Sequence, residues 1–300
     1  MIKNIVKLFI PPIIIKIWVC ISDFVFHQKL SKKFISTVAD IQRKSDKLII
    51  LGNGPSLNDS INELKEQIVE NDFIVVNMFC LTDYYVELKP KFYLLADYLY
   101  FVDISNFADF EKKFILDVTE SIVNKTQWDM NLIVPSKAVG SWFLAKTQTN
   151  PNIHVYFYNM LYLDNPLSLE SKFKAWDENL IAPPNQTVLN TCVWLGVFLR
   201  YKEIFLIGAD STFMQDIRVD QETNLLYLID SHFYGEIKRP IYTDADGTIP
   251  QKLHVELNSI SVMLSNYWDL KYYADYAGVK IYNASKYSLI DAYERRKRIN

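Results

Sequence analysis

The hydrophobic residues of this chain gather in short continuous runs that are separated by longer stretches of mixed character. In the first half such runs lie at 48–51, 73–77, 92–96, 132–134 and 154–158. Short apolar runs bounded by turn residues are typical of strands that a sheet buries on both faces. Because stretches with helical character intervene, the pattern predicts a mostly parallel α/β sheet.

The second half continues the alternation. An apolar helix is predicted at 188–199, a buried strand ending in glycine at 203–208, a helix at about 258–276 and a last strand at 279–283. Gly278 stands where a helix C-cap is expected. The fold class predicted is therefore α/β, a Rossmann-like, mostly parallel sheet flanked by helices, in one domain covering residues 48–300.

Residues 209–255 show little helical or strand periodicity, and they carry many acidic and aromatic side chains. A compact domain rarely keeps so long an irregular segment without a functional reason. We therefore expect an irregular lid over the active site, inserted into the single domain.

The first 47 residues form a different kind of segment. Residues 5–26 are strongly apolar, but Lys7, the pair Pro11-Pro12, Lys16 and Asp23 interrupt them, so the run is a poor membrane span and lacks the layout of a signal peptide. It suits an amphipathic helix on the inner face of the plasma membrane. Packing against the domain or a partner is the alternative.

Composition narrows the function classes. The 300 residues are 50% hydrophobic and 22% charged, which describes a globular chain, and the net charge of −3 speaks against nucleic acid as a partner. Three widely spaced cysteines without a Cys-x-x-Cys pair argue against a disulfide framework or a zinc site. They favour a reducing compartment, so we expect a cytoplasmic protein.

The segment Gly52-Asn53-Gly54-Pro55-Ser56 directly follows the first buried run. Glycines let the backbone turn sharply and approach a ligand, and Ser56 or Asn58 could cap a helix suggested by the apolar residues of 61–68. Amides at a helix N-terminus bind anions, so this turn predicts a phosphate site. The spacing matches neither a dinucleotide fingerprint nor a Walker loop, and a simple tight connection is the alternative.

Three motifs together resemble those of bacterial sialyltransferases of glycosyltransferase family 42. They are the turn with Leu57 after it, the strand end Val75-Val76-Asn77, and the segment 201–210, which ends Gly-Ala-Asp. The same motifs are similar to sialyltransferase-like enzymes of capsule and O-antigen gene clusters, and to the 6-hydroxymethylpterin pyrophosphokinase-like domain. The resemblance covers about residues 48–292.

The resemblance implies a set of donor contacts. In those enzymes the glycine turn meets the nucleotide phosphate, the asparagine that ends the second strand touches the nucleotide sugar, and the polar start of a later helix contacts the nucleotide. Carried over by motif, the substrate-binding residues are Gly52, Asn53, Gly54, Pro55, Ser56, Asn77, Asn185, Gln186, Thr187, Asn190 and Thr191.

The predicted lid contains Ser231-His232-Phe233-Tyr234-Gly235-Glu236, which resembles a Ser-His-Tyr-x-Gly-His stretch whose second histidine is the family's catalytic base. That position is Glu236 here, so either the base is a carboxylate or His232 has taken the role. An imidazole titrates near neutrality, whereas a glutamate needs an apolar setting to raise its pKa. Tyr234 is a further candidate for substrate contact. For both base candidates a purely structural loop role is the alternative.

Two carboxylates end predicted strands, and ligands collect at strand carboxyl ends in open α/β sheets. Asp210 is a candidate catalytic residue and Asp97 a candidate substrate contact, with turn or capping roles as the alternatives. The pair Asp244 and Asp246 has the Asp-x-Asp spacing of a metal site, but the following glycine favours a polar turn. We therefore expect no metal and no cofactor.

The sequence thus predicts an inverting, metal-independent glycosyltransferase that uses a CMP-sialic-acid-like or other nucleotide-sugar donor. The acceptor implied is a glycan or lipid-linked glycan of bacterial surface polysaccharide: capsule, O-antigen or lipooligosaccharide. One alternative is a Mg-ATP-dependent pyrophosphokinase of a pterin-like alcohol, and another is a non-catalytic nucleotide-sugar-binding protein. The oligomeric state stays open.

Overall fold

A computed structural model describes residues 11, 13–14, 17–18, 21, 38–105, 107, 109–159, 169–184, 186–243 and 248–299. Its centre is an eight-stranded sheet with the order β11-β10-β6-β1-β2-β3-β4-β5, in which every neighbouring pair is parallel. The strands are β1 (Lys47–Leu51), β2 (Asp72–Val76), β3 (Phe92–Leu94), β4 (Met130–Pro135), β5 (Ile153–Tyr158), β6 (Glu203–Ile207), β10 (Lys280–Asn283) and β11 (Glu294–Arg295). The predicted α/β fold class is confirmed.

The apolar runs form strands because both faces of the sheet are covered. On β1, Leu48 and Ile50 belong to one buried cluster, while Ile49 and Leu51 belong to a second cluster on the opposite face. Successive strand side chains point to opposite faces, so a strand covered on both sides needs apolar residues at every position.

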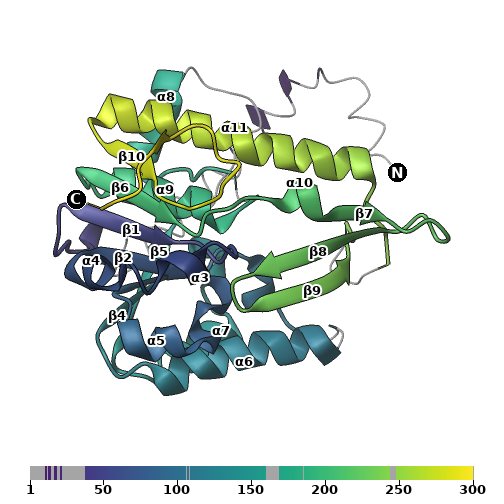
Figure 1. Ribbon diagram of the computed structural model, residues 1–300, viewed down its shortest axis with the longest axis horizontal. Helices are drawn as coiled ribbons and strands as arrows, with labels where there is room; N and C mark the ends of the chain where they lie inside the picture. The colour runs from purple at the N-terminus through teal and green to yellow at the C-terminus, as the bar shows by residue number, and fades with distance from the viewer. Residues whose placement is uncertain are drawn as a thin grey trace.

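Helices lie on both faces of this sheet (Figure 1). One face carries α8 (Leu169–Asp177), α9 (Val188–Phe198) and α11 (Leu253–Ala277), and the other carries α3 (Leu57–Ser60), α4 (Lys65–Glu70), α5 (Asp83–Leu88), α6 (Asp109–Lys125) and α7 (Trp142–Thr147). Short helical turns complete the connections: η1 (Val38–Asp40), η2 (Asn77–Leu81), η3 (Tyr98–Tyr100), η4 (Ser136–Ala138) and α10 (Phe213–Asp216).

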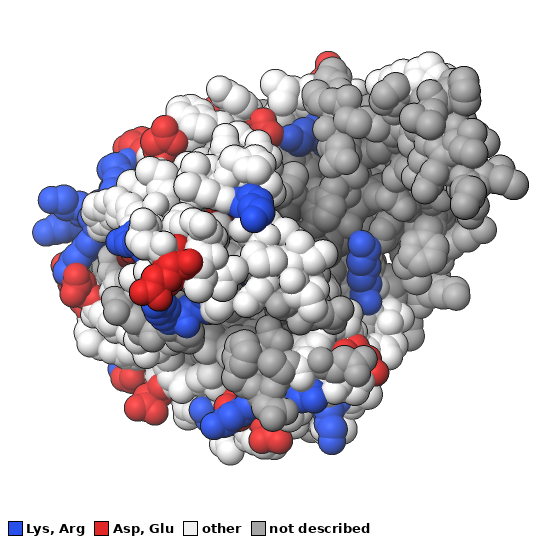
Figure 2. All heavy atoms as spheres, turned by 90° about the vertical axis from the view of Figure 1, so that its right-hand side faces the viewer, with Lys and Arg blue, Asp and Glu red and all other residues white. Residues whose placement is uncertain are grey.

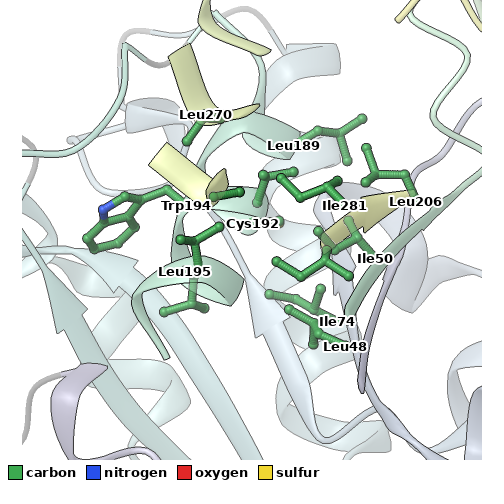
Figure 3. Packing of buried hydrophobic residues seen from close by; sticks show 14 of the residues in the cluster. Leu48, Ile50, Ile74, Leu189, Cys192, Trp194, Leu195, Leu206, Leu270 and Ile281 are labelled. Atoms are coloured by element: carbon green, nitrogen blue, oxygen red, sulfur yellow. The ribbon is translucent and has the colours of Figure 1, made fainter. Parts of the chain in front are cut away.

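Helix α9 is the centre of the first cluster, and Figure 3 shows its side chains between the sheet and α11. Cys192, Trp194 and Leu195 are almost fully buried against sheet residues such as Ile50 and Leu206. A helix enclosed on all sides is apolar all round, which explains the uninterrupted apolar run there.

The ends of the predicted helices agree with those in the structure to different degrees. Helix α11 ends at Ala277, and Gly278 has the left-handed φ of 72° expected for its cap. The single helix expected around 61–68 is instead two short helices, α3 and α4. That expectation was wrong because two consecutive short turns bury the same apolar residues, Ile61, Leu64 and Ile68, as one helix would.

The order of the strands defines a crevice. The chain runs from β1 outward to β5 and then returns to place β6 on the other side of β1. The loops after β1 and β6 therefore leave the sheet in different directions, and open α/β sheets bind ligands at such a switch point.

The segment expected as an irregular lid is largely ordered. Residues 217–240 form a three-stranded antiparallel sheet of β7 (Ile217–Val219), β8 (Leu226–His232) and β9 (Gly235–Pro240). The expectation of irregular chain was wrong because the strand signal is short: Leu226 and Leu228 are buried in alternate positions, among polar neighbours. The role of the segment as a lid stays a prediction. Figure 1 places this small sheet beside the main one.

The predicted N-terminal membrane contact falls mostly outside the described residues and stays a prediction. Among the residues described, the helices include none that is long and apolar enough for a membrane span. On the face shown in Figure 2, basic and acidic side chains are interspersed rather than gathered by sign.

Candidate active site

A small cavity of about 80 Å³ lies where the crevice is expected. Its walls come from the loops after β1, β2 and β6, from the start of α9 and from β8. The lining residues are Asn53, Gly54, Pro55, Val76, Asn77, Thr187, Val188, Leu189, Gly208, Asp210, Ser211, Thr212, Phe213, Asp216, Leu228, Ile229, Ser231 and His232.

The glycines of the first turn pack against the end of β6. The Gly52 and Gly54 amides donate to the carbonyl oxygens of Ile207 and Gly208, both at 2.8 Å. A Cβ added at Gly52 would lie 2.4 Å from the Gly208 oxygen, and one at Gly54 would lie 2.5 Å from Asp210 Cγ. Glycine is required here by the close approach of two protein turns.

Ser56 and Asp210 join these two turns. The Ser56 amide donates to Asp210 Oδ2 at 2.8 Å, and the Ser56 hydroxyl donates to Oδ1 of the same carboxylate. Burial raises the pKa of Asp210, and the two hydrogen bonds from Ser56 oppose that rise. The Asp210 carboxylate thus occupies the place that the sequence suggested for an anionic ligand.

The expected capping of a helix by Ser56 or Asn58 is therefore wrong. Helix α3 has four residues, and the Ser56 side chain makes no cap hydrogen bond to it. The Ser56 hydroxyl is engaged by Asp210, and the Asn58 carboxamide donates to the carbonyl oxygen of Phe233. A competing tertiary partner has replaced the local one in each case.

Three asparagines of the predicted site carry buried amide oxygens that have no hydrogen-bond partner within the described chain: Asn53, Asn77 and Asn190. Asn53 is 9% exposed and Asn190 is fully buried. The Asn53 nitrogen donates to the Val76 carbonyl at 3.1 Å, and this bond fixes which end of the carboxamide is the nitrogen and which is the unpaired oxygen. A buried acceptor left without a donor costs about 1–3 kcal/mol, so each such group calls for an explanation.

The chain around Asn77 is held in an unusual conformation. Asn77 has a φ of 50°, in the left-handed region, and its carbonyl accepts a hydrogen bond from the buried Tyr93 hydroxyl. Non-glycine residues in this region cluster at ligand sites and other functional positions. The conformation places Asn77 in the cavity wall beside Asn53.

The start of α9 forms another wall. Thr187 is its N-cap, with the hydroxyl accepting from the Leu189 amide at 3.4 Å. Asn190 and Thr191 are fully buried in the first turn. Gln186 accepts a hydrogen bond from Asn266 of α11 at 3.5 Å. The predicted contact Asn185 lies outside the described residues.

Helix α11 contributes residues that the sequence did not reveal. The Tyr267 and Ser211 hydroxyls lie 3.5 Å apart, and Ser211 lines the cavity. Tyr267 lies 56 residues after Ser211 in the chain, and only its position on the buried face of α11 could have indicated it.

The predicted catalytic segment lies at the tip of the β8–β9 hairpin. His232 lines the cavity, and the Tyr234 ring stacks on its imidazole with centroids 4.8 Å apart. His232 and Gly235 pair across the hairpin, so Phe233 and Tyr234 are its two-residue turn. Gly235 has a φ of 133°, which favours glycine. The side chain of Glu236 lies outside the described part of the structure.

The remaining carboxylates are placed elsewhere. Asp97 caps η3 by accepting from the Leu99 amide at 3.1 Å, and it is not among the cavity-lining residues. Desolvation by the surrounding protein raises the pKa of Asp97, and Arg239 opposes the rise. Asp244 and Asp246 lie outside the described residues. Within the described ranges, no group of three His, Cys, Asp or Glu side chains could hold a metal ion.

The fold and the cavity define a Rossmann-like α/β protein with a small cavity at the switch point of its sheet. No protein-family model matches the chain, and no curated protein matches it. A solved structure described as the MAf glycosyltransferase from Magnetospirillum magneticum AMB-1 is similar to it, with a TM-score of 0.49 and 14% identity over 86% of this chain and 34% of that one. The present chain thus spans about one third of that protein's length.

Proposed function

We propose that this protein is a glycosyltransferase that moves a sugar from a nucleotide-activated donor to a glycan acceptor, and that the donor binds between the ends of β1 and β6. The observation that carries the proposal is the pair of buried amide oxygens of Asn53 and Asn77, which line the cavity and have no protein donor within the described chain. A ligand rich in hydroxyl and amino groups, such as a nucleotide sugar, would satisfy them.

The charges of the cavity favour the neutral parts of such a donor over its phosphate. Among the described lining residues the charged ones are Asp210 and Asp216, and no Lys or Arg is present. The wall therefore suits the neutral ribose, base and sugar better than a chain of phosphates. For a phosphate the favourable wall is the start of α9 at Thr187, because the positive end of the eleven-residue helix dipole opens there.

The proposed chemistry is a single displacement. A base removes the proton of an acceptor hydroxyl, the oxygen forms a bond to the anomeric carbon, and the bond from that carbon to the nucleotide phosphate breaks, which inverts the anomeric configuration. The candidates for the base are His232, whose side chain lines the cavity, and Glu236. A positioned base of this kind contributes about 10²- to 10⁴-fold to the rate. We expect the reaction to need no metal.

We also propose that the acceptor is a glycan or lipid-linked glycan of surface-polysaccharide synthesis, used at the inner face of the plasma membrane. In support, Ile13, Ile17 and Trp18 are 53%, 52% and 71% exposed, and Ile21 is 56% exposed. Their spacing places them on one side of a helix. Flotation with vesicles of anionic lipid tests the membrane contact in this proposal, with Trp18→Ser as the variant expected to lose binding to the vesicles.

The decisive experiment is a thermal-shift panel of CMP-, UDP-, GDP- and dTDP-sugars and of ATP, each with and without Mg²⁺, because a ligand of the folded state raises its apparent stability. Stabilisation by one nucleotide sugar without metal is expected and names the donor. Stabilisation by Mg²⁺-ATP alone would replace the proposal with a pyrophosphokinase. Nucleotide-sugar binding with no turnover on any acceptor would indicate a non-catalytic binding protein.

A further inference from the structure

The tip of the β8–β9 hairpin is attached to the core by a small set of contacts on Phe233. Its amide donates to the Asn53 carbonyl at 3.0 Å, and its carbonyl accepts from Asn58 Nδ2 at 2.7 Å. The Phe233 ring is 7% exposed and lies 5.8 Å from the ring of Phe79. Of the residues on either side, Tyr234 has a contact of its own, from its hydroxyl to Met78 Sδ at 3.2 Å, and His232 lies on the strand that this anchor holds.

Asn58 differs from the other two partners. The Asn53 contact uses the backbone and the Phe79 contact belongs to the core, whereas Asn58 is an exposed residue whose side chain bridges α3 and the hairpin. Truncating an exposed side chain leaves the core intact. Asn58 can therefore be tested without unfolding the domain.

The same hairpin limits the size of the cavity. Leu228, Ile229, Ser231 and His232 of β8 form one of its walls. The cavity measures about 80 Å³, whereas sites for small organic ligands usually enclose about 300–1,000 Å³. A nucleotide sugar needs a larger opening, which an outward movement of β8 would provide, and the Phe233 anchor opposes that movement.

We infer that Asn58 is a positioning residue, which through the Phe233 carbonyl holds His232 at the cavity and keeps the hairpin closed over the donor. The inference deepens the proposed function and rests on it for the role of His232. The closed position of the hairpin is independent of that role. Asn58 thus couples the glycine turn, where the donor is proposed to bind, to the strand that carries the candidate base.

Hydrogen exchange measures the anchor without any substrate. In Asn58→Ala we expect the amides of residues 226–240 to exchange roughly fivefold faster than in the wild type, the factor implied by the loss of one ordinary hydrogen bond. Asn58→Asp is a size-matched second variant, since its carboxylate cannot donate to the Phe233 carbonyl.

The matched control is Asn62→Ala. Asn62 is also exposed, and its carboxamide donates to the Tyr84 hydroxyl at 3.1 Å, away from the hairpin. The Asn62→Ala variant should leave the amides of residues 226–240 exchanging at the wild-type rate. Equal exchange in Asn58→Ala, Asn58→Asp and the control would overturn the inference, as would a uniform rise over the whole chain, which would mean general destabilisation.

Turnover with the donor found by the thermal-shift panel gives the second measurement. We expect Asn58→Ala to lower kcat at least tenfold and to change the donor KM by a smaller factor, because the base is displaced whereas only one wall of the donor cavity, β8, moves with it. An unchanged kcat would overturn the positioning role. If no nucleotide sugar binds but the hairpin of Asn58→Ala exchanges faster, the proposed function fails while the anchor stands.

Discussion

The carboxylate of Asp210 accepts two hydrogen bonds from Ser56, one from its backbone amide and one from its hydroxyl. These residues are 154 positions apart in the chain. The pair fastens the loop after β1 to the loop after β6 at the switch point of the sheet. A residue predicted as a candidate catalytic residue thus has a direct role in holding the cavity wall, and its carboxylate already has two hydrogen-bond donors.

Removing the Ser56 hydroxyl tests this fastening. Since a hydrogen bond to a charged group contributes about 1.5–3 kcal/mol, Ser56→Ala should lower the free energy of unfolding by that amount in urea denaturation. Ser60→Ala is the matched control, because the equally buried Ser60 hydroxyl donates to the neutral Ser56 carbonyl at 3.1 Å. A loss no larger than that of the control would mean that the Asp210 bond is weak.

The raised pKa of Asp210 predicts the pH dependence of the same pair. The folded protein holds a proton on Asp210 more tightly than the unfolded chain does, so this contribution to stability is full below the unfolded pKa and is lost as pH rises through the folded pKa. The unfolding free energy of the wild type minus that of Asp210→Asn should therefore fall as pH increases above about 4. A difference that grows with pH would contradict the sign of the shift.

The close contact of the two turns predicts that Gly52 accepts no side chain. In Gly52→Ala the added Cβ would lie 2.4 Å from the Gly208 oxygen, so the backbone must move, and overpacking of this kind costs about 1–3 kcal/mol or more. At Gly140 an added Cβ meets nothing within 4 Å, and only the positive φ of 80° opposes it. Gly140→Ala should cost about 1–2 kcal/mol. Denaturation of the two variants side by side checks the order.

The open amide oxygen of Asn190 predicts a separation of stability from binding. The oxygen has no partner in the described chain, and the Asn190 nitrogen donates one hydrogen bond, to the Met263 carbonyl at 3.4 Å. Asn190→Leu should therefore lower the free energy of unfolding by about 1 kcal/mol at most while reducing the thermal shift given by the donor nucleotide. Asn71→Leu is the contrasting variant: both ends of its carboxamide are paired, with Ser45 and with the Gln67 carbonyl, so it should lose stability and keep binding. A large stability loss in Asn190→Leu with unchanged binding would assign Asn190 to the core.

The identity of the base is settled by two substitutions. We expect His232→Ala to reduce kcat by about 10²- to 10⁴-fold and to leave donor binding intact, since a base acts on the acceptor hydroxyl in the transition state. Glu236→Gln keeps the size of the side chain and should retain most of the activity. The reverse result in steady-state kinetics would transfer the role to Glu236.

The sequence determined the elements whose surroundings are uniform. The runs that became β1, β2, β3, β4 and β6 are apolar at nearly every position because each lies inside a sheet covered on both faces, and the same cause marks α9. The Gly278 cap was predictable because glycine is favoured there by the left-handed backbone conformation of the cap itself and not by a distant contact. Such features depend on local chemistry and burial, which the order of residues displays directly.

Tertiary structure alone decided how the site motifs are used. The glycine turn was expected to bind phosphate, yet its amides and Ser56 are engaged by the end of β6, a segment far away in the chain. Phe233 meets Asn58, and Tyr267 reaches Ser211, through contacts that no local pattern encodes. The physical reason is competition: a polar group that could cap a helix or bind an anion takes whichever partner the packing of the sheet brings within hydrogen-bond distance.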